Sequence, residues 1–239
     1  MSKKNKTKIN NPVTKEEKRA RRQKNMTGFN KSLIFAVALT IIVGILIKGF
    51  GFGVSSSQEE SEDTTAEEET VELLSGTHHV EINVKDYGTI SVELDADTAP
   101  ITVTNFVDLA KDGFYDGLTF HRIIDGFMIQ GGDPQGDGTG GSEKSIKGEF
   151  TDNGVENALS HTRGAISMAR TVDADSASSQ FFIMQADNTD LDGSYACFGY
   201  VTDGMEIVDQ ICKDTPVQDD NGTVAAEDQP VIESIKVVD

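Results

Sequence analysis

The stretch FHRIIDGFMIQGGD, residues 120–133, decides how the rest of the sequence is interpreted. Its apolar residues fall on both sides of an Asp-Gly pair, which is a common turn sequence. This pattern predicts two short strands, over 119–124 and 127–131, joined by the turn.

The same stretch brings unlike side chains together. Side chains alternate between the two faces of a strand, so Met128 and Gln130 share one face, and Arg122 lies on the neighbouring segment. A cation, an amide and large apolar groups are therefore predicted to lie close to one another. Taken alone, the pattern also fits a surface charge at Arg122 and ordinary core positions at Phe127 and Met128.

Short strands are predicted on both sides of this stretch. Apolar and polar residues alternate over 78–84 and, after a turn, again around Ile90, Val92 and Leu94, which is typical of a hairpin. Further strands are predicted over 164–169, 179–184, 197–201 and 231–238. Eight strands with long Gly-rich loops indicate a mainly β fold, and we expect a closed eight-stranded antiparallel barrel capped by two helices.

The first predicted helix follows the hairpin. Thr98 is predicted as its N-cap, with Pro100 in the first turn. Apolar residues recur from Val103 to Ala110 at helical spacing, and Gly113 is expected to end the helix. The second helix is predicted over 204–212.

The N-terminal part differs from the rest in composition. Residues 1–31 hold 11 Lys and Arg, and residues 32–54 are mostly apolar, with Lys48 as their single charged residue. We expect a basic cytoplasmic tail over 1–31 and a single uncleaved transmembrane signal anchor over 32–54, with the remainder of the chain outside the cell membrane. A cleaved signal peptide is the competing interpretation, although no Ala-x-Ala site follows, and a buried core helix is a third.

An acidic segment separates this anchor from the folded part. Residues 55–76 contain eight acidic residues and no basic one, so we expect a disordered linker there and a folded domain over 77–239. The formal net charge of the whole chain is −19. An acidic body would repel phosphates, which argues against a nucleic-acid partner.

Several motifs are set aside. Residues 136–141 match G-x-G-x-x-G, but no helix is predicted after them. Residues 188–193 resemble the start of a calcium loop, but Gly199 stands where a bidentate Glu is needed. The His residues are scattered, so we expect neither a metal nor a cofactor. Cys197 and Cys212 are interpreted as ordinary thiols, with a single disulfide as the alternative.

Residues 120–133 closely resemble the signature of the cyclophilins, which are peptidyl-prolyl cis-trans isomerases. Other motifs of that family follow in the same order, and the resemblance covers about residues 77–239. They are the glycine loop at 138–141, the strand sequences at 166–169 and 179–183, and the loop and strand from 191 to 201.

The resemblance implies a set of site residues and an activity. Arg122 and Gln130 would be catalytic, and an apolar notch for the proline ring would be formed by Phe127, Met128, Ala169, Phe182, Leu191 and Tyr195. The implied activity is rotation about Xaa–Pro bonds in proline-containing polypeptides, as a membrane-tethered foldase for exported chains. A proline-peptide binding module or holdase with little catalysis is the alternative, and a surface interaction protein using its acidic face is a third.

The sequence departs from the family pattern at the rim of that site. Many relatives carry Trp, His, Asn and Pro where this chain has, in that order, Asp190, Tyr195, Arg170 and Asp125. These changes put strong binding of the family's cyclic-peptide drug in doubt. Tyr195 still offers an aromatic wall and a hydroxyl.

Overall fold

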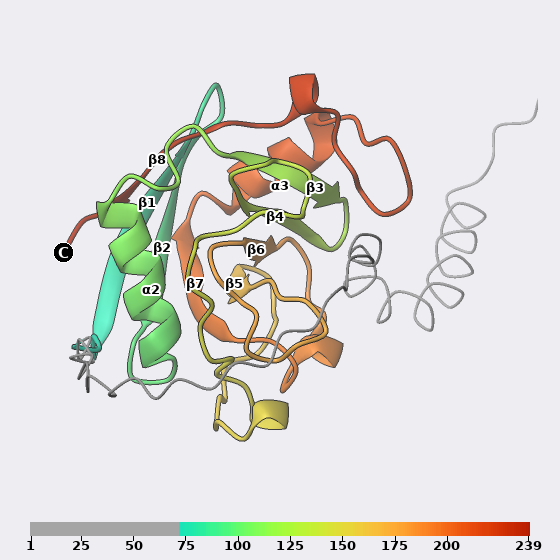
Figure 1. The fold of residues 1–239 in the computed structure, drawn as a ribbon. Coiled ribbons are helices and arrows are strands. Elements are labelled where there is room, and N and C mark those ends of the chain that lie inside the picture. The colour runs from blue at the N-terminus through green and yellow to red at the C-terminus, as the bar shows by residue number, and fades with distance from the viewer. Residues whose placement is uncertain (1–71) are drawn as a thin grey trace, which may run out of the picture. The chain divides into compact units, whose positions relative to one another are not determined.

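The computed structural model describes residues 72–239, which form one antiparallel sheet and two α-helices (Figure 1). The helices are α2 (Pro100–Lys111) and α3 (Met205–Asp214). The strands are β1 (Thr77–Val84), β2 (Gly88–Asp95), β3 (Thr119–Ile124), β4 (Met128–Asp133), β5 (Ala165–Met168), β6 (Phe181–Met184), β7 (Cys197–Asp203) and β8 (Ile232–Val237). The predicted basic tail and anchor, and the linker up to residue 71, lie outside the described residues.

The strands follow the order β3-β4-β6-β5-β7-β2-β1-β8 in the sheet. The prediction of a mainly β, eight-stranded antiparallel fold with two helices is therefore confirmed. The edge strands β3 and β8 are joined by one isolated bridge between Thr119 and Val231 rather than by a continuous ladder. The described part of the chain is thus an eight-stranded sheet whose two edges touch at that bridge.

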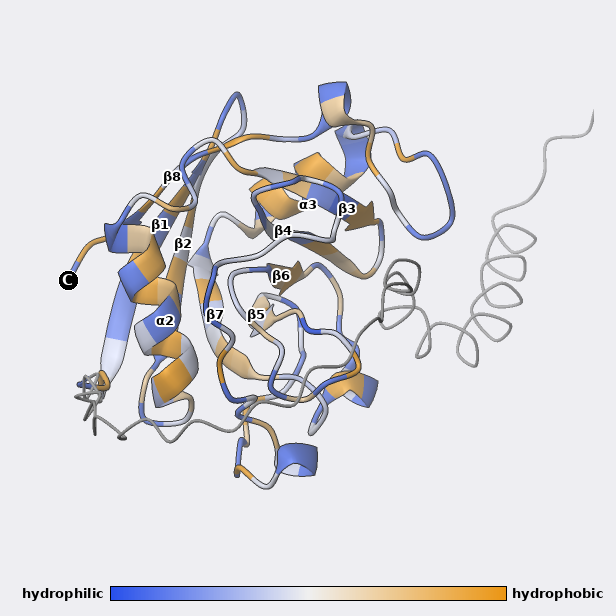
Figure 2. Ribbon diagram, viewed as in Figure 1, coloured by the Kyte–Doolittle hydropathy of each residue, from blue (hydrophilic) through white to orange (hydrophobic). Residues whose placement is uncertain are grey.

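The main core lies between one face of the sheet and the helices. Val103, Phe106 and Val107 of α2 are fully buried there. Phe106 packs against the rings of Tyr115 and Phe198 at centroid distances of 5.1 and 5.2 Å. Figure 2 shows that α2 carries both apolar and polar residues, as expected of a helix that covers a core on one side.

The start of α2 differs from the prediction. Thr98 is not the N-cap, because the helix is preceded by Ala99, and the Thr98 hydroxyl instead donates to Asp95 at 2.7 Å. The buried carboxylate of Glu149 accepts the free N–H groups of Ile101 and Thr102 at 3.0 and 2.8 Å. The cap therefore comes from a residue distant in sequence, which local capping rules do not consider.

Two further findings concern the described residues only. No helix within 72–239 is long and apolar enough to cross a bilayer. Cys197 and Cys212 are both buried free thiols, which agrees with the ordinary-thiol interpretation and not with a disulfide. Burial raises the pKa of each of these thiols to about 12.

Candidate active site

The position of Arg122 depends on a β-bulge in β3. Phe120 pairs with Gly131 and Arg122 pairs with Gln130, so His121 is one extra residue opposite β4. Residues two apart in a strand normally share a face, but the bulge puts Phe120 in the core and Arg122 on the opposite face. The alternation predicted for 119–124 therefore breaks at this point.

Strand pairing places the other candidate site residues in a row beside Arg122, on the same face of the sheet. Arg122 lies opposite Gln130, Gln130 opposite Phe182, and Phe182 opposite Ser167, which links β3, β4, β6 and β5 in one row. Directly paired residues of antiparallel strands project from the same face. Arg122, Gln130 and Phe182, predicted from separate motifs, are thus neighbours in the structure.

The guanidinium of Arg122 is held from two sides. Its Nη1 donates to Oε1 of Gln130 at 3.2 Å and lies 4.0 Å from the sulfur of Met128. Its Nε donates to the backbone oxygen of Asn221 at 2.9 Å, and its Nη2 donates to the Asn221 side chain at 3.3 Å. Gln130 is fixed in turn, because its Nε2 donates to Gln180 at 2.9 Å.

The surroundings of Arg122 combine partial burial with nearby polar groups. Burial lowers the pKa of Arg122, and negative charge at Tyr195 and Asp219 would raise it again. A guanidinium titrates so far above neutral pH that the group stays charged. A permanent cation therefore stands at the edge of the apolar part of the site.

That apolar part is a second core cluster, separate from the main core. All six predicted substrate-binding residues belong to it, four of them buried (Met128, Ala169, Phe182 and Leu191) and two half-buried (Phe127 and Tyr195). Tyr195 meets Phe182 edge to face, with centroids 5.8 Å apart and rings at 87°. The structure therefore brings every predicted site residue to one place.

The rim of this cluster contains a stacked arginine whose role the sequence did not indicate. The guanidinium carbon of Arg170 lies 4.9 Å from the ring centroids of both Phe150 and Tyr195. Nε and Nη2 of Arg170 donate to the backbone oxygen of Ser194 at 3.0 and 2.8 Å. Burial raises the pKa of Tyr195, and the Arg170 charge lowers it. Arg170 thus stacks on the Tyr195 ring while its own position is fixed by Ser194.

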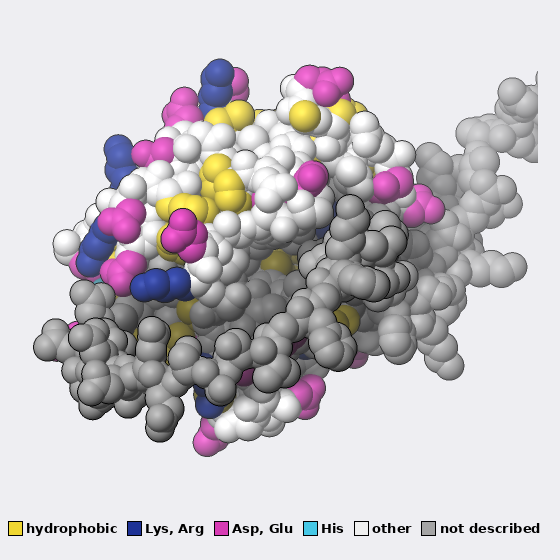
Figure 3. Space-filling model, viewed as in Figure 1, with side chains coloured by type: hydrophobic (Ala, Val, Ile, Leu, Met, Phe, Trp, Pro, Cys, Tyr) yellow, Lys and Arg dark blue, Asp and Glu magenta, His cyan; other side chains and the backbone are white. Residues whose placement is uncertain are grey.

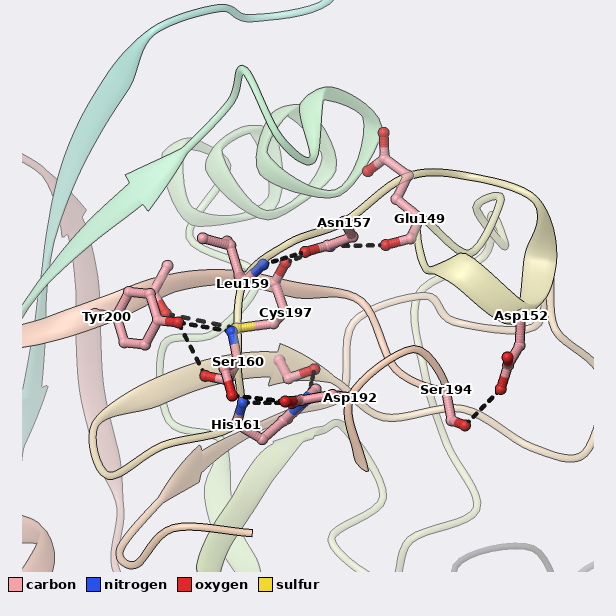
Figure 4. A network of polar contacts seen from close by, with 12 residues as sticks. Glu149, Asp152, Asn157, Leu159, Ser160, His161, Asp192, Ser194, Cys197 and Tyr200 are labelled. Carbon is pink, nitrogen blue, oxygen red and sulfur yellow. Dashed lines mark hydrogen bonds and ion pairs between the residues drawn. The ribbon is translucent and has the colours of Figure 1, made fainter. Parts of the chain in front are cut away.

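A buried histidine, His161, packs against Phe182 and is bonded to Asp192, a contact drawn in Figure 4. The His161 ring stacks on Phe182 at a centroid distance of 5.9 Å and an angle of 19°. Oδ1 of Asp192 accepts from the His161 backbone N–H at 2.7 Å and lies 2.8 Å from its Nδ1, while Oδ2 accepts from Ser160 at 2.6 Å. Nε2 of His161 lies 3.1 Å from the Ser167 hydroxyl. Burial lowers the pKa of His161, against the opposing effect of Asp192.

The remaining rim positions face solvent. Asp125 and Asp190 are exposed, so the residues that replace the family's Pro and Trp add charge at the surface and take no part in the apolar cluster. On the face drawn in Figure 3, acidic side chains are scattered among neutral ones. Residues 72–239 contain no group of three or more His, Cys, Asp or Glu side chains placed to hold a metal ion.

Sequence reasoning missed the residues that orient the site. Asn221 is 99 positions from Arg122, and Gln180 is 50 positions from Gln130. The sequence marks His161 only as one of four scattered histidines. No local pattern marks such partners, because the sheet pairing and the loops alone bring them into contact.

Comparison with known proteins agrees with this geometry. The sequence pattern of the cyclophilin type peptidyl-prolyl cis-trans isomerases matches residues 79–237. The chain is 47% identical over 133 residues to peptidyl-prolyl cis-trans isomerase A of Dickeya dadantii, covering 52% of this chain and 66% of that protein. It is 47% identical over 123 residues to peptidyl-prolyl cis-trans isomerase B of Bacillus subtilis, covering 52% of this chain and 82% of that protein.

A solved structure is also similar. The cyclophilin type peptidyl-prolyl cis-trans isomerase of Cryptosporidium parvum, crystallised in the presence of the dipeptide Ala-Pro, has a TM-score of 0.60 and 31% identity. The alignment covers 67% of this chain and 99% of that one.

Proposed function

The chain belongs to the cyclophilin-type peptidyl-prolyl cis-trans isomerases, a family of enzymes, and from that premise we propose that Arg122 and its apolar notch accelerate rotation about Xaa–Pro bonds. The barrier to this rotation is about 18–20 kcal/mol and comes from resonance of the planar amide. Any contact that is stronger in the twisted amide than in the planar one speeds the rotation. No bond breaks, so the reaction does not need a nucleophile.

The notch would hold the ring of the proline. Phe127, Met128, Phe182 and Leu191 offer apolar surface, and burying the ring there would fix the proline while the preceding peptide group rotates. Tyr195 forms an aromatic wall against Phe182. Because the ring is equally apolar in both isomers, this binding fixes the substrate without choosing between them.

Arg122 would bind the twisted amide more strongly than the planar amide. Gln130 and Asn221 accept three of its five N–H groups, and Nη1 also points at the Met128 sulfur at 4.0 Å, which leaves at least one N–H, on Nη2, for the substrate. Twisting localises the lone pair on the prolyl nitrogen and so increases the electron density there. A cation with a free N–H group stabilises that electron density. A gain of about 3 kcal/mol in the twisted state would accelerate rotation by about 150-fold, since about 1.36 kcal/mol gives a factor of ten.

The observation that carries this proposal is the contact of one guanidinium with both parts of the site. Nη1 of Arg122 is hydrogen-bonded to Gln130 and lies 4.0 Å from the sulfur of Met128, a buried member of the apolar cluster. The test is the rate of cis-trans exchange of a short Xaa-Pro peptide, measured by NMR with Arg122→Ala. The matched control is Lys236→Ala, which removes an exposed positive charge from β8.

We expect Arg122→Ala to lower the exchange rate about 100-fold, with an unchanged melting temperature, and Lys236→Ala to behave like the wild type. Near-normal exchange with Arg122→Ala would contradict the assignment. If the wild type binds the peptide without accelerating exchange, the chain is a proline-peptide binding module or holdase and not an active isomerase.

The edges of the sheet are proposed to close into a barrel. This is supported by hydrogen bonds beside the Thr119–Val231 bridge, from Gly117 to Ile232 at 2.8 Å and from Phe120 to Pro230 at 2.9 Å. Closure would remove the exposed edges of β3 and β8, along which other chains could pair. Slow amide hydrogen exchange at both N–H groups would support closure, and rapid exchange would exclude it.

The N-terminal segment is proposed to tether the domain outside the cell membrane, where it would act on exported chains. Support comes from sequence alone: 11 basic residues precede the uncharged residues 32–47, and an acidic segment follows. Unaided proline isomerisation takes tens of seconds, so newly exported chains would gain from catalysis. In intact cells, added protease should digest the domain. Digestion only after lysis would refute this topology.

A further inference from the structure

The residues that hold Arg122 from the side opposite Gln130 form a short loop, 219–224, which we call the arginine-holding loop. It makes two contacts with the guanidinium, through the backbone oxygen and the side chain of Asn221. Contact at Nε and Nη2, together with Gln130 at Nη1, fixes both the position and the plane of the group.

The loop is itself organised by one carboxylate. Oδ1 of Asp219 accepts the N–H groups of Asn221 and Thr223 at 3.0 and 3.1 Å, and Oδ2 accepts the Thr223 hydroxyl at 2.9 Å. These contacts keep the pKa of Asp219 below its usual range. The Asp219 side chain thus holds the turn at Asn221 and Thr223 in addition to the backbone hydrogen bond from Gly222 to Asp219 at 3.1 Å.

The loop also lies against β3 through the backbone. Gly222 accepts the N–H of Ile123 at 2.8 Å, and the N–H of Val224 donates to His121 at 3.0 Å. Gly222 has φ +82°, and a Cβ there would collide with the carbonyl oxygen of Ile123. The close approach and the left-handed backbone both require glycine. The loop is therefore tied to the bulged segment of β3 that carries Arg122.

We propose that Asp219 is a positioning residue for the isomerase reaction, acting through Asn221 on Arg122. The inference rests on the proposed function of Arg122. Asp219 does not need to touch the substrate: it holds the turn in which Asn221 accepts from Nε of Arg122. Loss of the turn would leave Arg122 present and charged but free to rotate away from the prolyl nitrogen. This would weaken stabilisation of the twisted amide, and so lower kcat, more than it would weaken binding of the peptide.

The test compares Asp219→Ala with Asp220→Ala. Asp220 is exposed, carries the same charge and is the next residue in the loop, and its side chain makes no hydrogen bond within residues 72–239. We expect Asp219→Ala to lower kcat about tenfold with KM within about twofold, and Asp220→Ala to leave both unchanged. Asp219→Asn should recover part of the activity, because its amide oxygen can still accept one backbone N–H.

Two further measurements separate positioning from other causes. In an Arg122→Lys background, which has no Nε–H to orient, Asp219→Ala should add less than a twofold loss. In the otherwise wild-type chain, the NMR signal of the Arg122 Nε–H should exchange with water faster in Asp219→Ala than in Asp220→Ala. Equal behaviour of the two alanine variants in both kcat and the Nε–H signal would overturn the inference. If the wild type lacks isomerase activity, the proposed function fails, and the Nε–H signal still decides the contact.

Discussion

Replacing Asp192 by alanine should destabilise the domain more than any neighbouring surface change. Asp192 follows the turn that carries Leu191, and its carboxylate serves three partners on Ser160 and His161 (Figure 4). The imidazole of His161 is fully buried and stacked on Phe182, so water cannot replace its hydrogen bond when the carboxylate is removed.

The size of the effect follows from these contacts. Hydrogen bonds to a charged group contribute about 1.5–3 kcal/mol each, but 34% of the Asp192 side chain is exposed, so we assign about 1 kcal/mol to each. The three together give about 3 kcal/mol of unfolding free energy. For a domain of this size, that corresponds to a fall in melting temperature of about 6–12 °C.

The assay is urea unfolding followed by circular dichroism at pH 7.5, with Asp190→Ala as the matched control. Asp190 lies two residues earlier, is exposed and carries the same charge. The control should change the unfolding free energy by less than about 0.5 kcal/mol. If Asp192→Ala is no more destabilising than Asp190→Ala, the network beneath the notch does not support the fold as described.

Two other predictions concern pH and packing. Burial lowers the pKa of both His161 and His121, so these histidines bind protons at a higher pH in the unfolded chain than in the folded one. Their contribution to the free energy of unfolding should therefore be complete above about pH 6.5 and decline as the pH falls below that value. Denaturation midpoints that do not change between pH 7.5 and 5 would contradict this. Gly131→Ala should cost about 1–3 kcal/mol in thermal unfolding, because its Cβ would come within 2.7 Å of the Thr119 carbonyl oxygen and 2.9 Å of the Phe120 ring; a wild-type melting temperature would show that β3 and β4 can separate there at no cost.

The regular elements could be predicted from the sequence. The alternation at 78–84 and 231–238 corresponds to β1 and β8, and the second predicted helix, 204–212, corresponds to α3. These predictions succeed because side-chain periodicity is set by residues two to four positions apart, which is local information. The identities of the candidate site residues were likewise predicted from ordered motifs.

The tertiary structure decided how those residues are oriented. The bulge at His121 turns Arg122 to the outer face, and Glu149 in place of Thr98 caps α2. Asn221 reaches Arg122 across 99 positions of sequence. Strand order and loop paths bring such partners together, and no short-range pattern records them. The sequence by itself therefore determined which groups are available to act on a prolyl bond, and the packing of distant segments determined where each of them points.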